Sequence, residues 1–238
     1  MRDLLTVAGK EWRELLGGRG FRGKSGIALT IAVFGIVLPL QTGRAWIESP
    51  IALASWIWVP MFLVASVITE AFAGERERHT LETLAATRLS DEAILYGKMT
   101  AAVVYAMAVS AISLLLGFIT VNLKVAGDGL IMFSPVAVAV VALVGVLGAI
   151  LVAAAGTMIS LHSPTVRQAV QLLGGVIMAV FLAPILVVKE LGPSVLGLVG
   201  AMEPVTLVAL FLAAGTILDA AVVALAQRQF NRSRIATV

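Results

Sequence analysis

The sequence predicts an all-α, polytopic membrane protein with six transmembrane helices, and three observations support this fold class. Of the 238 residues, 60% are hydrophobic and 13% are charged, whereas a soluble domain has roughly 45–50% apolar and about 25% charged residues. The apolar residues are gathered into long runs, and a helix needs about 20 of them to cross a bilayer core of about 30 Å. Basic residues are concentrated in alternate connections between these runs. The connections are too short to hold a separate soluble catalytic domain.

We expect residues 1–238 to form a single transmembrane domain, with the six spans inside residues 26–226. The spans cover roughly residues 26–46, 51–73, 95–121, 134–161, 166–188 and 204–226. Trp46, Trp56 and Trp58 cluster around the first outer connection, which is typical of an aromatic belt at a membrane surface. Residues 189–203 hold an apolar run too short to cross, which predicts a short outer helix that dips into the membrane. An outward extension of the neighbouring spans is the alternative.

Residues 1–25 predict an N-terminal amphipathic helix followed by a basic, glycine-rich linker. Apolar side chains recur at helical spacing between residues 2 and 16, which favours a helix lying in the membrane interface over an ordinary surface helix. The linker matches the P-loop pattern from Gly18 to Ser25. A P-loop needs a strand before it and a soluble helix after it, but here an amphipathic helix precedes the linker and a span follows it. We therefore interpret the match as spurious.

The distribution of Lys and Arg predicts the orientation of the chain. Of the 17 basic residues, all but Arg44, Lys124 and Lys189 fall on one side of the predicted spans. Because short cytosolic loops are enriched in Lys and Arg, both termini, including the tail 227–238, are expected in the cytoplasm. We expect a multi-pass protein of the plasma membrane. The net charge of +3 then reflects orientation in a lipid bilayer, and no nucleic-acid partner is expected.

One dense polar segment, residues 70–98, interrupts the apolar runs. Leu81, Leu84 and the following alanine share a narrow face at helical spacing, and Thr80 can cap the start of a helix. Ser90 can cap a second helix that continues into the third span. The pattern predicts a short helix lying crosswise beneath the membrane, from about Thr80 to Thr87, within a cytosolic segment at residues 74–94.

The residues of this segment resemble a known family. The run from Glu75 to Leu84, followed by Ser90, Ile94-Leu95 and Gly97-Lys98, is similar to the cytosolic motif of ABC type-2 transporter permeases. That motif reads roughly E-x-E-x-G-T-L-E-x-L, then small residues, a proline, an Ile-Leu pair and Gly-Lys. The chain departs from it at His79, where glycine is usual, and at Arg88, where proline is usual.

The resemblance implies a permease subunit of an ATP-binding-cassette exporter, without its own ATPase activity. Two permease copies, expected as a homodimer, would pair around a pathway above two separate ATPase subunits. ATP and Mg would be bound by those partners, and no cofactor by this chain. The crosswise helix would dock on the ATPase, and Glu75 and Glu77 would lie at an inner gate. The docking residues implied are Thr80, Leu81, Glu82, Leu84 and Arg88. A solvated, membrane-proximal loop is the alternative interpretation of these charges.

Few fixed charges lie inside the predicted spans, which favours an amphipathic or hydrophobic substrate. Asp219 in the sixth span is a possible intramembrane polar site, with a structural pairing equally open. The chain has no cysteine and only two distant histidines, so neither a metal site nor a catalytic residue is predicted. Export of haem, polysaccharide or sodium by the same architecture is an alternative function. A non-transporting membrane scaffold is an alternative of another class.

Overall fold

The computed structural model describes residues 2–17, 24–80, 88–125, 129–200 and 202–230. Every regular element in these ranges is helical, which confirms the predicted all-α fold. The elements are α1 (Arg2–Gly17), α2 (Lys24–Ala32), the π-helical turn η1 (Val33–Val37), α3 (Leu38–Thr42), α4 (Ala45–Glu48), α5 (Pro50–Ser55), α6 (Trp58–Ile68), α7 (Glu70–Glu77), α9 (Asp91–Lys124), α10 (Pro135–His162), α11 (Val166–Gly200) and α12 (Pro204–Gln229).

Within the described ranges, five helical stretches are long and apolar enough to cross a membrane. They are Ser25–Thr42, Pro50–Glu77, Asp91–Lys124, Pro135–His162 and Pro204–Gln229. A shorter apolar stretch, Val166–Val180, lies in α11, where the fifth span is predicted. The chain is a multi-pass membrane protein.

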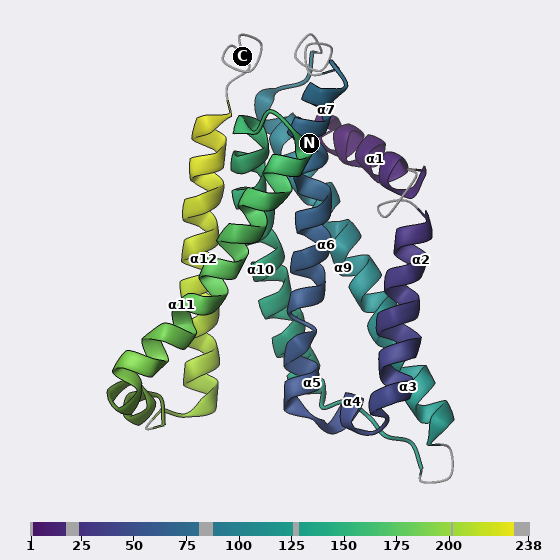
Figure 1. The fold of residues 1–238 in the computed structure, drawn as a ribbon, viewed down its shortest axis with the longest axis vertical. Coiled ribbons are helices and arrows are strands. Elements are labelled where there is room, and N and C mark those ends of the chain that lie inside the picture. Colours follow the sequence, from purple (N-terminus) through teal and green to yellow (C-terminus); the bar gives the residue numbers. More distant parts are fainter. Residues whose placement is uncertain (1, 18–23, 81–87, 126–128, 201, 231–238) are drawn as a thin grey trace.

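The long helices run beside one another along the longest axis of the molecule (Figure 1). α10 packs against α6, α9 and α12, and α1 packs against α9. α1, α7 and the last turn of α12 lie at the same end of the bundle, which we call the α7 end, while α4 and α5 lie at the opposite end (Figure 1).

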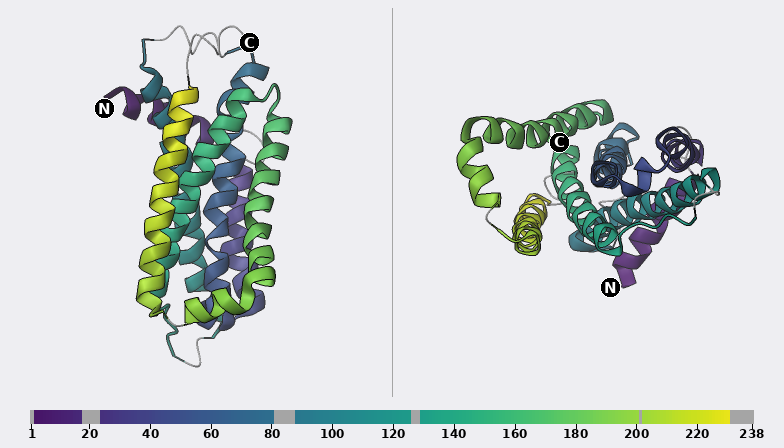
Figure 2. Two further views of the ribbon diagram at one scale, coloured as in Figure 1. Left: turned by 90° about the vertical axis from the view of Figure 1, so that its left-hand side faces the viewer. Right: turned by 90° about the horizontal axis from the view of Figure 1, so that it is seen from below.

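α11 is a single bent helix, and this differs from the predicted boundary between a span and a separate dipping helix. The helix continues through Gly192 and Pro193 to Gly200. Its part farthest from the α7 end turns aside from the bundle axis (Figure 2). Prolines inside a helix remove a backbone hydrogen bond and favour such bending. Residues 189–200 of the segment predicted to dip therefore belong to the bent end of α11.

The predicted aromatic belt is wrong for two of its three tryptophans. Trp46 and Trp56 are each only 4% exposed, and their rings meet edge to face with centroids 5.2 Å apart. The first span ends at Thr42 because Gly43 adopts a φ of 59°, and the chain then folds Trp46 back against Gly117 of α9. The two indole rings therefore bury their large apolar area inside the bundle, at the end opposite the α7 end.

Small residues bring α10 close to α6. A Cβ atom placed at Gly156 would overlap Cγ2 of Ile68, and one placed at Gly148 would lie 2.8 Å from Sδ of Met61. Glycines let two membrane helices approach until their backbones nearly touch. Gly174 and Gly175 of α11 have nothing within 4 Å of a Cβ position, so they bring no helix of the same chain close.

The helical stretch that holds α6 and α7 is interrupted at Thr69, and a side chain of α10 forms hydrogen bonds with the backbone groups at the interruption. The hydroxyl of Ser160 accepts hydrogen bonds from the backbone N–H groups of Phe72 (3.2 Å) and Ala73 (3.0 Å). It donates one to the carbonyl of Thr69 (2.9 Å). Buried backbone groups need partners inside a membrane protein. Ser160 therefore holds α7 at a defined angle to α6.

Candidate functional site

The polar residues at the end of α7 explain part of the sequence motif in physical terms. The N–H of His79 donates to the carbonyl of Arg76 (3.0 Å), and the N–H of Thr80 donates to the carbonyl of Glu75 (2.9 Å). These two bonds form a Schellman motif, in which the residue after the helix cap takes a left-handed conformation. That residue is His79, with a φ of 57°. The position where the motif usually has glycine is therefore one where the backbone favours glycine.

Glu75 belongs to a buried group of charges. The ammonium of Lys98, on α9, lies 2.8 Å from Oε1 of Glu75 and 2.8 Å from Oε1 of Glu11 on α1. The side chain of Lys98 is 2% exposed, that of Glu11 is 18% exposed and that of Glu75 is 16% exposed. Lys98 also lies 5.4 Å from the ring centroid of Phe72. One cation thus joins α1, α7 and α9.

Gly97 explains how α1 comes close enough to reach this cation. A Cβ atom at Gly97 would lie 2.7 Å from Cβ of Val7 and 3.4 Å from the carbonyl oxygen of Leu4. Any side chain at this position would push α1 away from α9. The adjacent Gly97 and Lys98 therefore act together, because the first admits α1 and the second binds its carboxylate.

The next two residues of α7 contact two other helices. Arg76 donates from Nη1 to the carbonyl of Ser163 (2.5 Å) and from Nη2 to the carbonyl of Leu161 (2.8 Å), at the end of α10. Glu77 accepts a hydrogen bond at Oε1 from the N–H of Val166 (2.8 Å), the first residue of α11. A cation at a helix C-terminus and an anion at a helix N-terminus both suit the helix dipole.

We call Glu75, Arg76 and Glu77 the α7 hub. Three consecutive side chains bind three different parts of the bundle: α9 with α1, the end of α10, and the start of α11. Because each link uses charge-assisted hydrogen bonds, the α7 hub resists displacement relative to these helices. A force applied to the chain just after α7 would reach all of them.

Three of the five predicted docking residues lie within residues 81–87, which the structure does not describe, and the other two flank them. Leu81, Glu82 and Leu84 lie outside the described residues. Thr80, before the gap, donates its hydroxyl to the carbonyl of Glu75 (3.2 Å). Arg88, after it, is exposed, and Ser90 caps α9 as predicted, accepting from the N–H of Ala93 (3.2 Å).

Sequence reasoning singled out Glu75 and Glu77 but missed that Lys98 pairs with Glu75 and Glu11. It also missed Ser160, which bonds the backbone at the start of α7. The Gly-Lys pair of the motif was the signal for Lys98. Glu11 and Ser160 carried no signal, because a glutamate on an amphipathic helix and a serine at a span end are common. Asp219 is 6% exposed on α12, and its Oδ2 atom has no hydrogen-bond partner among the described residues.

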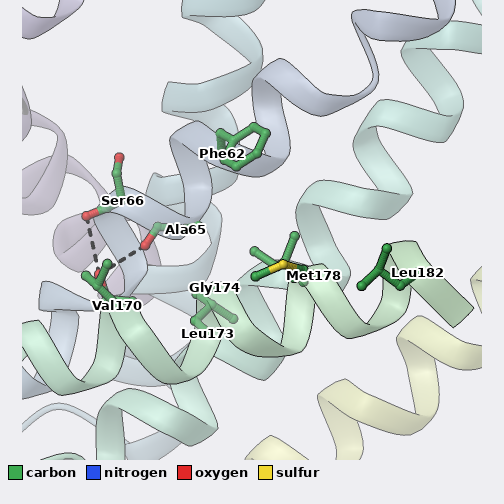
Figure 3. Close-up of a pocket in the computed structure, with 10 residues that line it drawn as sticks. Phe62, Ala65, Ser66, Val170, Leu173, Gly174, Met178 and Leu182 are labelled. Atoms are coloured by element: carbon green, nitrogen blue, oxygen red, sulfur yellow. Dashed lines mark hydrogen bonds between the residues drawn. The ribbon is translucent and has the colours of Figure 1, made fainter.

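A cavity of about 620 Å³ lies between α6 and α11. Figure 3 shows Phe62 and Ser66 of α6 and Met178 and Leu182 of α11 among its lining side chains. The lining is almost wholly apolar. The only two hydroxyls in it, on Ser66 and Thr69, donate to carbonyls of their own helical stretch. The cavity thus suits an apolar group and presents no charge to a polar one.

Among the described residues, no group of three or more His, Cys, Asp or Glu side chains could hold a metal ion. The P-loop pattern from Gly18 to Ser25 follows one helix, α1, and ends inside a second, α2, whereas a P-loop follows a strand.

Comparison with known proteins gives one match. A family model described as ABC-2 type transporter matches residues 20–217 of the chain. This range contains the α7 hub, the gap that follows it and both helices that line the cavity. Among curated proteins, the search finds no sequence that matches this chain.

Proposed function

The chain belongs to the ABC-2 type transporter family, and we propose that it is the permease subunit of an exporter driven by a separate ATPase. Members of this family are membrane transport components that work with an ABC ATPase subunit. In this proposal, two copies of the chain form a homodimer and two ATPase subunits bind beneath it. ATP and Mg are bound by the ATPase subunits, and no cofactor by this chain.

The α7 hub is the observation that carries the proposal. The segment from Thr80 to Arg88 begins three residues after α7 ends and finishes three residues before α9 starts. A partner that moves this segment pulls on α7 and α9 together. The links from Glu75, Arg76 and Glu77 then carry the movement to α1, α10 and α11.

The distribution of basic residues supports an orientation in which the α7 end faces the cytoplasm of a plasma-membrane protein. Both termini then lie on the ATPase side. Leu81 and Leu84 serve as apolar anchors on the ATPase, with Thr80, Glu82 and Arg88 as polar contacts.

The cavity between α6 and α11 supports a hydrophobic or amphipathic substrate. Its lining offers apolar surface at Phe62, Met178 and Leu182, and one link of the α7 hub, from Glu77 to the N–H of Val166, ends on α11, which forms one wall of the cavity. We propose that the apolar part of the substrate enters here and that ATP-driven movement of α11 against α6 releases it. Haem, polysaccharide and sodium would each need polar or charged contacts that this lining does not supply.

The proposed docking segment is tested by purifying the chain together with its candidate ATPase. The double variant Glu82→Ala plus Leu84→Asp is expected to separate the two proteins or to abolish stimulation of ATP hydrolysis. A matched control is Glu203→Ala plus Leu130→Asp, which makes the same changes at exposed positions of the opposite end. Co-purification and stimulation that survive the first pair of changes would contradict docking through this segment. An unchanged chain that binds no ATPase would favour the scaffold function instead.

The proposed substrate cavity predicts that Gly174→Leu blocks it while Gly175→Leu does not. Gly174 lines the cavity, whereas its neighbour does not, and neither has an atom within 4 Å of a Cβ position. The probe is a phospholipid with a diazirine in its acyl chain, photolysed in vesicles that contain the protein. Labelling of Ile177 and Met178 should fall strongly in Gly174→Leu alone. Equal labelling in both variants would contradict an apolar ligand at this place.

A further inference from the structure

We propose that α1 is a working part of the force path between the ATPase and the spans, with Glu11 and Lys98 as positioning residues. The inference rests on the proposed function and adds one element to it. Glu11 and Glu75 share a single buried cation, so α1 is held to the same point of α9 as α7 is.

The contacts of α1 show that it is fitted to α9 rather than only resting on a membrane. Val7 is 5% exposed and lies against Gly97. Trp12 meets the ring of Tyr105 edge to face, with centroids 6.4 Å apart. The charged link at Glu11 lies between these two apolar contacts along α1. Three contacts along one helix face give α1 a defined position on α9.

The group at Lys98 has one positive and two negative charges, and this makes the connection between α1, α7 and α9 sensitive to movement. One ammonium serves two carboxylates, and Oε2 of Glu75 is buried with no hydrogen-bond partner among the described residues. A buried charge that loses its partner is costly. When α7 moves with the docking segment, Lys98 must either follow Glu75 or stay with Glu11. With both carboxylates in place, α1, α7 and α9 move as one unit.

Another carboxylate on the same helix provides the matched control. Glu14 pairs with Lys10 at 3.3 Å, but these side chains are 58% and 57% exposed. Replacement of Glu14 by Gln removes the same charge from the same helix without touching the buried group. If α1 is only a membrane anchor, the Glu11→Gln and Glu14→Gln variants should behave alike.

The experiment measures whether α1 follows α7 in the full complex with the ATPase. Because the chain has no cysteine, spin labels at Arg13→Cys and Arg78→Cys, in complexes diluted with unlabelled chain and assembled with a cysteine-free ATPase, report the distance between α1 and the end of α7. Both native side chains are exposed. We expect the same distance in the nucleotide-free and vanadate-trapped complexes of the otherwise unchanged chain and of Glu14→Gln. In Glu11→Gln the two states should give different distances.

Stimulation of ATP hydrolysis by this chain is the second measurement. It should fall about tenfold in Glu11→Gln, the size of a typical coupling between sites, and stay unchanged in Glu14→Gln. Glu11→Asp keeps the charge but shortens the side chain, so its stimulation of ATP hydrolysis should lie between those of the other two variants. It replaces Glu11→Gln in both measurements if that variant does not assemble with the ATPase. If an assembled Glu11→Gln complex matches Glu14→Gln in both measurements, the inference is wrong and the proposed function stands. If the unchanged chain binds no ATPase, both fail.

Discussion

Replacement of Lys98 by Met is expected to lower the free energy of unfolding by about 3 kcal/mol, the lower end of the cost of breaking a buried pair, because it leaves two largely buried carboxylates without their cation. Both ion pairs of Lys98 measure 2.8 Å, and its side chain is 2% exposed. Methionine matches the length of the aliphatic part of lysine, so the loss reports the charge rather than a cavity. The same change should detach α1 and α7 from α9 and uncouple ATP hydrolysis from movement of the spans.

Thermal unfolding of the purified protein in detergent measures the loss of stability. Lys10→Met is the matched control, because it removes an exposed pair with Glu14 on the surface of α1. Exposed pairs of this spacing contribute about 0.3–0.5 kcal/mol. Equal melting temperatures for the two variants would show that the buried group does not hold the α7 end together.

Replacement of Gly156 by Leu is expected to prevent close packing of α10 on α6. A Cβ atom at this position would overlap Ile68 and lie 3.1 Å from Cδ2 of Leu173. Those two side chains are 0% and 1% exposed, so neither can move aside. Overpacking of a dense core costs about 1–3 kcal/mol and occasionally more. We expect a loss of stability at or above the upper end of this range, because the leucine side chain adds three further carbon atoms beyond the overlapping Cβ atom.

The control for Gly156→Leu is Gly174→Leu, the same change on the neighbouring helix at a position with open space around it. Thermal unfolding should separate the two variants clearly, with Gly174→Leu close to the unchanged protein. A mild effect of Gly156→Leu would contradict the close approach of α10 and α6 on which the position of Ser160, and hence of α7, depends.

The spans were largely predictable because hydrophobic length and charge placement are properties of the sequence. α10 begins and ends within one residue of the predicted span at residues 134–161. The cap at Ser90 was also predicted, since capping depends on local sequence, whereas the cap at the end of α7 was not. The left-handed His79 gives a reason for the usual glycine at this place in the motif.

The interior of the bundle was not predictable from local patterns. Trp46 and Trp56 have the composition of a membrane-surface belt, but a turn at Gly43 folds them inward. Glu11 looked like one of several charges on the polar face of α1, and only the packing at Gly97 brings it to Lys98. Ser160 gains its role from a break in another helical stretch. Each of these depends on long-range packing that no single segment encodes.

The central claim is that the α7 hub carries movement of the docking segment to the helices around the cavity. The most direct test is the distance between spin labels at Phe62→Cys on α6 and Leu182→Cys on α11, in complexes diluted with unlabelled protein. We predict that this distance changes when the bound ATPase is trapped with nucleotide, and that the change is lost when Glu77→Ala removes the link from α7 to the start of α11. A change that persists in Glu77→Ala, in a complex that still binds the ATPase, would contradict the role of the α7 hub.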